Sequence, residues 1–121
     1  MKFEFEKKHT LEERKTEANR IIMKYPERIP VICEKEKGLY GIPDIEKSKY
    51  LVPCDLTMGQ FMYVIRKRLK LSSEQAIFLF INGSIPSATS IICDVYEKNR
   101  NEDRFLYISY SGENTFGKKN L

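Results

Sequence analysis

Residues 57–70 read TMGQFMYVIRKRLK, and this stretch decides the fold. Thr57 and Gln60 have the spacing of a capping box, in which each side chain bonds to the backbone of the other residue at the start of a helix. Phe61 and Ile65 follow at helical spacing on one side. A helix with one apolar side must cover other elements, so we expect this one to be the main core helix.

Short apolar segments on both sides of this helix read as strands. Residues 28–34 and 49–53 precede it, and the lysines and the proline around 49–53 are typical of a protected sheet edge. Residues 76–81 follow it and are continuously apolar, as expected for a strand covered on both faces. Residues 105–110 alternate and predict the last strand.

Capping signals predict two further helices. Thr10 and Glu13 form a capping box ahead of a helix that Pro26 stops. Ser90 is expected to cap a short helix that runs to about Lys98. The order of elements is then helix, two strands, helix, strand, helix and strand.

This order, with a late strand returning to the sheet centre, predicts an α+β fold, the β-grasp or ubiquitin-like roll. A ferredoxin-like arrangement is the alternative. We expect two additional N-terminal helices in residues 1–26, packed on the domain as an extension. Residues 27–111 are expected to form the β-grasp domain, and residues 112–121 a flexible C-terminal tail.

The composition is that of one globular domain. The chain has 121 residues, of which 41% are hydrophobic and 31% charged, and a formal net charge of +4. Its longest unbroken apolar run is too short to cross a bilayer, and its charged N-terminus lacks the apolar stretch of a secretory signal. We therefore expect a cytoplasmic protein.

Cysteine and histidine usage argues against an enzyme. Cys33, Cys54 and Cys93 are an odd number at no ligand-like spacing, which predicts reduced thiols and no metal site. His9, the single histidine of the sequence, lies in the N-terminal segment. No cysteine, serine or carboxylate pair has a spacing that suggests activation by it. We expect no catalytic residues and no cofactor.

A basic RNA-binding module is the alternative from another class. Arg66–Arg68 and Lys70 form a basic cluster, and the chain has seven tyrosines. These cations end a helix and are not interleaved with aromatic residues on a strand. We therefore expect no nucleic acid among the partners.

Several short sequence motifs, taken together, resemble those of the ubiquitin-like autophagy modifiers, the family of autophagy-related protein 8 and the GABA type A receptor-associated protein. The resemblance runs from about Lys2 to Gly117. The motifs are Lys24-Tyr25-Pro26, Arg28-Ile29-Pro30-Val31-Ile32, Lys49-Tyr50-Leu51-Val52-Pro53, Gly59-Gln60-Phe61, Ile65-Arg66-Lys67-Arg68 and Tyr110-Ser111-Gly112-Glu113-Asn114-Thr115-Phe116-Gly117.

The resemblance implies a processing site after Phe116 and Gly117. A dedicated cysteine protease would cut there, and activating-like and conjugating-like enzymes would carry the glycine as a thioester before its transfer to phosphatidylethanolamine. Glycine suits a narrow tunnel because it has no β-carbon. The protein would then be a tag on autophagosomal membranes and a monomer in solution. A ubiquitin-like adaptor that is never conjugated is the alternative.

The family also captures cargo-receptor peptides of the form aromatic, two variable residues, aliphatic. An edge strand at 49–51 can accept such a peptide as an added strand. The resemblance places the aromatic side chain in a first pocket made by Glu17, Ile21, Pro30, Lys49, Leu51 and Phe105. It places the aliphatic side chain in a second pocket made by Ile32, Tyr50, Val52, Pro53, Leu56, Phe61 and Val64.

Two further sets of residues complete the predicted binding surface. Arg28 and Lys47 would attract acidic residues beside the peptide motif. A second docking strip proposed for the family, which accepts helical ubiquitin-interacting motifs, matches Ala76, Ile77, Phe78, Leu79 and Phe80. A buried strand explains the same residues without any partner.

Overall fold

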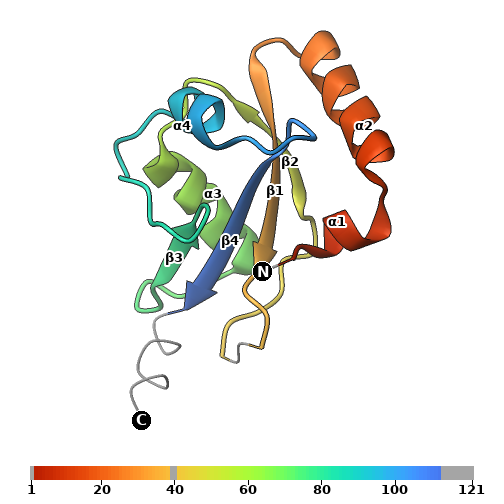
Figure 1. Cartoon of the computed structure of the whole chain (residues 1–121). Coiled ribbons are helices and arrows are strands. Elements are labelled where there is room, and N and C mark those ends of the chain that lie inside the picture. The colour runs from red at the N-terminus through yellow and green to blue at the C-terminus, as the bar shows by residue number, and fades with distance from the viewer. Residues whose placement is uncertain (1, 39–40, 113–121) are drawn as a thin grey trace.

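A computed structural model describes residues 2–38 and 41–112 of the chain (Figure 1). The predicted processing site at Phe116 and Gly117 lies outside the described residues, as does most of the predicted tail. The elements are α1 (Glu4–Lys8), α2 (Leu11–Lys24), β1 (Arg28–Lys35), β2 (Lys49–Pro53), α3 (Met58–Leu69), β3 (Ile77–Phe80), α4 (Ile92–Asn99) and β4 (Leu106–Gly112).

Within the described residues, four strands form one mixed sheet in the order β2-β1-β4-β3. The first and last strands, β1 and β4, are parallel neighbours at its centre, whereas β2 and β3 pair antiparallel at its two edges. This is the β-grasp roll, so the predicted fold class is confirmed and the ferredoxin-like alternative is wrong. β4 extends along the sheet to Gly112, two residues beyond the predicted strand.

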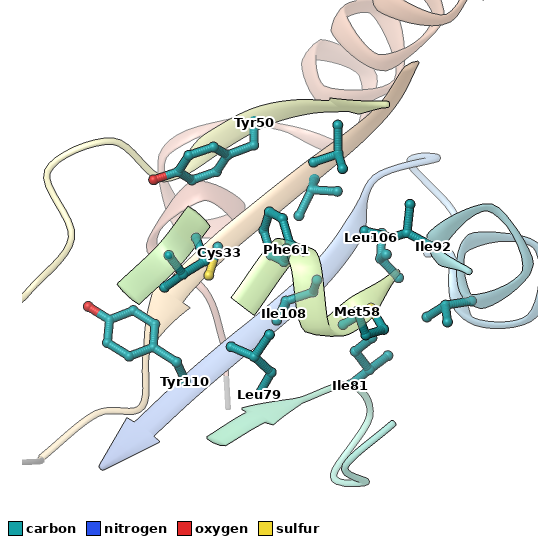
Figure 2. Close-up of a cluster of buried hydrophobic side chains, with 14 of the residues drawn as sticks. Cys33, Tyr50, Met58, Phe61, Leu79, Ile81, Ile92, Leu106, Ile108 and Tyr110 are labelled. Atoms are coloured by element: carbon teal, nitrogen blue, oxygen red, sulfur yellow. The ribbon is translucent and has the colours of Figure 1, made fainter. Parts of the chain in front are cut away.

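The sheet is covered on both faces (Figure 1). On one face, α3 contributes Phe61 to the larger hydrophobic cluster (Figure 2). Ile65 of the same helix also belongs to this cluster. On the other face, Ala18 and Ile21 of α2 pack with Phe105 and other residues in a second cluster. β4 is therefore buried on both sides along most of its length, although its alternating sequence resembled that of a half-exposed strand.

Both predicted capping boxes are present. The Gln60 backbone N–H donates to Thr57 Oγ1 over 3.1 Å, and the Thr57 N–H donates to the Gln60 side chain over 2.9 Å. Thr10 and Glu13 bond in the same reciprocal way at the start of α2. α3 ends where Lys70 adopts a left-handed conformation with φ of 55°.

Two local predictions are wrong. The apolar run at 76–81 is an edge strand, in which Ile77 and Leu79 are buried but Phe78 and Phe80 are half-buried, so it is not covered on both faces. Ser90 does not cap α4. Its carbonyl oxygen accepts the N–H of Met58, and the residue at the N-cap position is Ile91.

Candidate functional site

The outer edge of β2 has no strand beside it among the described residues. The Cys33 N–H donates to the carbonyl oxygen of Ser48 over 2.7 Å, immediately before β2 begins. Because inward and outward residues alternate in an antiparallel pair, Lys49 and Leu51 turn their backbone N–H and C=O groups away from β1. These groups are the ones that an added strand would need.

Basic side chains lie along this edge. Arg28 Nη1 donates to the outward carbonyl oxygen of Leu51 over 3.0 Å. The exposed Lys47 places its Nζ 5.8 Å from the centre of the Tyr50 ring. A chain that pairs with β2 must therefore displace one contact of Arg28, and it meets positive charge when it does so.

The residues predicted for the first pocket lie together. Ile21, Pro30 and Phe105 are buried on the α2 side of the sheet, and the half-buried Leu51 packs against the same cluster. Lys49 Nζ reaches from β2 toward α2, where it lies 2.9 Å from both carboxylate oxygens of Glu17. The Lys49–Glu17 ion pair therefore lies at the edge of the apolar surface made by Ile21, Pro30 and Phe105.

Most residues predicted for the second pocket lie on the α3 side of the sheet. Tyr50, Val52 and Phe61 are buried there, with the Tyr50 and Phe61 rings packed edge to face at 5.9 Å (Figure 2). Leu56 is half-buried against this cluster, and Val64 is 36% exposed. Pro53 is half-buried as the last residue of β2. The deep part of this region is filled by its own side chains.

The resemblance assigned Ile32 to the second pocket, but the structure places its side chain on the α2 side of the sheet. It belongs to the cluster with Ile21 and Phe105, not to the cluster with Tyr50. The register explains the error, because Ile32 is opposite Lys49 in the sheet and opposite residues share a face.

The predicted second docking strip lies at the other edge of the sheet. Its residues Ile77, Phe78, Leu79 and Phe80 form β3, with only Ile77 and Leu79 buried. Ala76 precedes the strand and is half-buried. The strip is thus remote from β2, with β1 and β4 between them.

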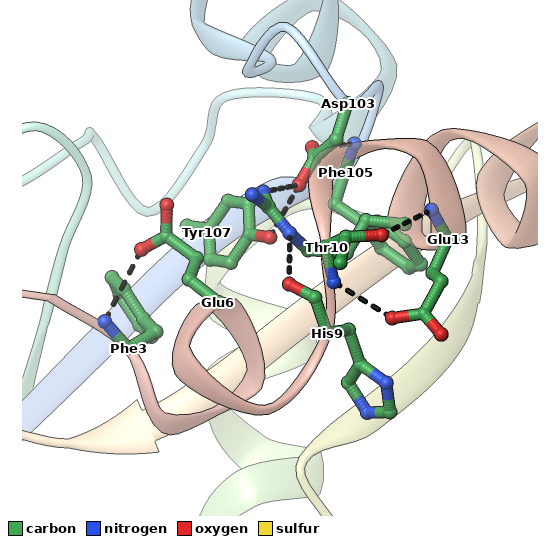
Figure 3. Close-up of polar contacts among 9 residues, drawn as sticks. Phe3, Glu6, His9, Thr10, Glu13, Asp103, Phe105 and Tyr107 are labelled. Atoms are coloured by element: carbon green, nitrogen blue, oxygen red, sulfur yellow. Dashed lines mark hydrogen bonds and ion pairs between the residues drawn. The ribbon is translucent and has the colours of Figure 1, made fainter.

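A buried polar network holds α2 onto the sheet, and the sequence did not indicate it. Asp103, with 0% of its surface exposed, accepts Arg14 Nη1 at 2.6 Å and the Tyr107 hydroxyl at 2.5 Å. Its other oxygen accepts the Phe105 N–H at 2.9 Å (Figure 3). Burial and the bond to Asp103 raise the pKa of Tyr107. Burial alone would lower the pKa of Arg14, but the bond to Asp103 and further polar contacts leave it raised.

The described residues contain no group of three or more His, Cys, Asp or Glu side chains that could hold a metal ion. Their helices also include none that is long and apolar enough to span a membrane.

A mixed sheet with a crossover helix and a central parallel pair of first and last strands defines a ubiquitin-like protein. A family model described as "Autophagy protein Atg8 ubiquitin like" matches residues 13–117. The chain belongs to this family and is a ubiquitin-like modifier of autophagy.

Relatives match nearly the whole chain. Autophagy-related protein 8 of Mycosarcoma maydis is 56% identical over 98% of this chain and 99% of its own length. Autophagy-related protein 8B of Oryza sativa subsp. indica is 58% identical over 96% of this chain and 97% of its own length. The crystal structure of Trypanosoma brucei ATG8 superposes with a TM-score of 0.88 at 39% identity, over 93% of this chain and 97% of that one.

Proposed function

We propose that this modifier is cut after Gly117 and then joined through that glycine to phosphatidylethanolamine. The proposal is supported by membership of the family and by a glycine that follows an aromatic residue near the end of the sequence. A cysteine protease frees the Gly117 carboxyl group, and activating-like and conjugating-like enzymes carry it as a thioester. The lipid amine attacks the thioester carbonyl, an amide forms, and the enzyme thiol leaves. The chain is the substrate of this chemistry and not its catalyst.

The attached lipid gives the protein its membrane location in this proposal. Two acyl chains anchor a protein stably where one chain binds only marginally. The unconjugated form is then a cytoplasmic monomer, and the conjugated form lies on autophagosomal membranes.

The intact mass of the full chain, incubated in extract of its own cells, tests this proposal. We expect loss of residues 118–121 and then a gain the size of phosphatidylethanolamine, and neither change in Gly117→Ala. Gly112→Ala is the matched control, because its new methyl group would meet Ile42 only at an ordinary contact distance of 3.5 Å. An unchanged mass under autophagy-inducing conditions would contradict conjugation and leave a non-conjugated adaptor.

We further propose that the edge of β2 captures cargo-receptor peptides by strand addition. The observation that carries this is the outward turn of the backbone groups of Lys49 and Leu51, with an apolar cluster on either side of the strand. The peptide aromatic side chain would lie over Ile21 and Leu51, beside the Lys49–Glu17 ion pair. The aliphatic side chain would lie between Leu56 and Val64.

The expected affinity is modest. Each buried side chain contributes about 1.5–3 kcal/mol before ordering costs. Micromolar binding needs about 8 kcal/mol, so the backbone hydrogen bonds of the added strand must supply the rest. Part of the free energy gained from this burial is used to open the second pocket, because the side chains of Tyr50 and Phe61 fill its deep part. Acidic residues in the peptide would contact Arg28, Lys47 and Lys49 and so speed the encounter.

Calorimetry with an aromatic-x-x-aliphatic peptide tests the capture. We expect Leu51→Ala to weaken binding by about tenfold or more, since it removes apolar area from the first pocket. Met23→Ala is the control, because Met23 is 83% exposed on α2 and lies outside the predicted pockets. Equal affinity of Leu51→Ala and Met23→Ala would contradict the proposal. Tyr50→Ala is a poorer test, because Tyr50 also packs in the core.

A further inference from the structure

Two cysteines from distant parts of the sequence lie side by side. Cys54 is in the turn that follows β2, and Cys93 is in the first turn of α4. The Cys93 N–H donates to the carbonyl oxygen of Cys54 over 3.1 Å, and the adjacent Ile92 N–H donates to Leu56 over 2.8 Å. Both thiols are half-buried against the α3-side cluster, and burial together with the nearby Cys54 raises the pKa of the Cys93 thiol.

This geometry fits a disulfide. With standard backbone dimensions, the bond from the Cys93 N–H to the Cys54 carbonyl keeps the two Cα atoms within about 7 Å. Disulfides join residues whose Cα atoms are about 4.4–6.8 Å apart. Both side chains pack against the same hydrophobic cluster, so the bridge requires little movement of the backbone.

We propose that Cys54 and Cys93 form a reversible intramolecular disulfide when a peroxide oxidises the protein. One thiolate attacks an oxygen of hydrogen peroxide, the O–O bond breaks, and a sulfenic acid and hydroxide result. The hydroxide takes up the proton that the thiol had released and becomes water. The second thiol then attacks that sulfur, so the S–S bond forms, the S–O bond breaks and a second water leaves. Two electrons pass from the two sulfur atoms to the peroxide. A dithiol reductant reverses the reaction by thiol–disulfide exchange.

The third cysteine is excluded from this reaction. Cys33 is fully buried in β1, and burial raises the pKa of its thiol, so it has neither access to peroxide nor a thiolate at neutral pH. Burial and the neighbouring Cys54 also raise the pKa of Cys93. Oxidation of the pair is therefore slow at neutral pH and becomes faster as the pH rises.

The disulfide would fasten the turn after β2 to α4. It closes a loop that contains α3 and β3, which restricts the unfolded chain. Pro53 and Leu56 flank Cys54 on this turn, so the bridge also holds the second peptide pocket in its filled state. This last consequence rests on the proposed peptide capture.

Peroxide treatment of the reduced full chain at pH 8 tests the proposal. We expect an intact-mass loss of about 2 Da, a digest fragment that links Cys54 to Cys93, and reversal by dithiothreitol. The melting temperature should rise by about 10 °C. Peptide affinity should fall by about threefold, as the open pocket becomes less populated. Cys54→Ser and Cys93→Ser, both at half-buried positions, should show none of these changes.

Other products would overturn the proposal. Oxygen addition without a linked fragment, dimers as the only disulfide product, or a mass loss that persists in Cys54→Ser would each exclude the bridge. The digest could show the Cys54–Cys93 bridge while peptide affinity stays unchanged and Leu51→Ala still weakens binding. That result would exclude the claim that the bridge holds the second pocket in its filled state. If Leu51→Ala also had no effect, peptide capture itself would be the part that failed.

Discussion

At the scale of the residue, Asp103 is the side chain on which the attachment of α2 depends most. Its carboxylate is fully buried and bonded to a guanidinium, a phenol and a backbone N–H. A buried ion pair contributes little beyond apolar residues of the same size, but removal of one partner leaves the other charged and buried. The network therefore fixes where α2 lies and makes that position costly to disturb.

Asp103→Ala is expected to lower the free energy of unfolding by about 3–5 kcal/mol. The reason is that Arg14, whose side chain is 14% exposed, would keep its charge without a carboxylate partner, with the His9 carbonyl oxygen as its remaining acceptor. Urea unfolding measures the loss. Glu97→Ala is the control, since it removes an exposed pair with Arg100 at 3.8 Å and should cost less than about 0.5 kcal/mol. Similar stabilities of the two variants would show that the Asp103 network does not hold the fold.

At the scale of the element, α1 is a short helix whose first N–H groups are bonded to one carboxylate of the sheet. The N–H groups of Glu4 and Phe5 donate to the two carboxylate oxygens of Glu34, at 2.8 and 3.1 Å. The ring of Phe5 also packs at 5.0 Å from that of Phe105. A helix of five residues is not stable alone, so these contacts determine whether α1 forms.

Glu34→Ala is expected to release α1 while the sheet stays folded. Loss of the two charge-assisted hydrogen bonds together, at about 1–3 kcal/mol, corresponds to roughly 5- to 150-fold faster amide exchange in residues 4–8. Hydrogen exchange followed by mass spectrometry measures this directly. Exchange in α3 should not change, and the exposed Glu46→Ala should leave both helices as they are. Unchanged protection of residues 4–8 would show that the aromatic contacts hold α1 without Glu34.

Local signals predicted the elements well where the deciding contacts are local. The capping boxes at Thr10 and Thr57 depend only on residues three positions away, and both helices begin where the sequence indicated. The cap at Ser90 failed because the N–H groups that its side chain would accept, those of Ile92 and Cys93, already donate to the carbonyl oxygens of Leu56 and Cys54. A cap signal does not show which backbone groups the fold has already used.

Strand faces and edges were harder to predict because they depend on pairing. The apolar run at 76–81 does not distinguish a central strand from an edge strand, and only the sheet order decides. The resemblance assigned Ile32 to the second pocket, and only the register of β1 against β2 shows on which face it lies. Asp103 lies in a charged stretch that reads as a surface turn, and no local pattern marks it as buried.

At the scale of the whole molecule, the sheet separates two clusters that both contain buried tyrosines. Tyr50, Tyr96 and Tyr110 lie on the α3 side, and Tyr107 lies on the α2 side. Burial raises the pKa of Tyr50 to about 12. It also raises the pKa values of Tyr96, Tyr107 and Tyr110. Alkaline pH therefore acts on both clusters at once.

The protein is expected to lose stability steeply above about pH 10, the ordinary pKa of tyrosine. Above that pH the unfolded tyrosines lose their protons while the buried ones keep them, so the unfolded state binds fewer protons and unfolding becomes more favourable. For Tyr50 the loss runs from the unfolded pKa to its folded value of about 12. Each tyrosine contributes up to about 1.4 kcal/mol per pH unit. Urea midpoints between pH 8 and 12 measure the slope.

Tyr50→Phe is the matched variant for this test. Its hydroxyl is buried without a hydrogen-bond partner among the described residues, so its removal should leave stability at pH 7 unchanged or slightly higher. The decrease of the urea midpoint with pH above about pH 10 should become less steep, by the contribution of one tyrosine. Tyr110→Phe should flatten the slope similarly but cost about 1 kcal/mol at pH 7, because that hydroxyl donates to the Pro43 carbonyl over 2.8 Å. A urea midpoint that stays constant from pH 8 to 12 would show that the buried tyrosines ionise as readily in the fold as in the unfolded chain.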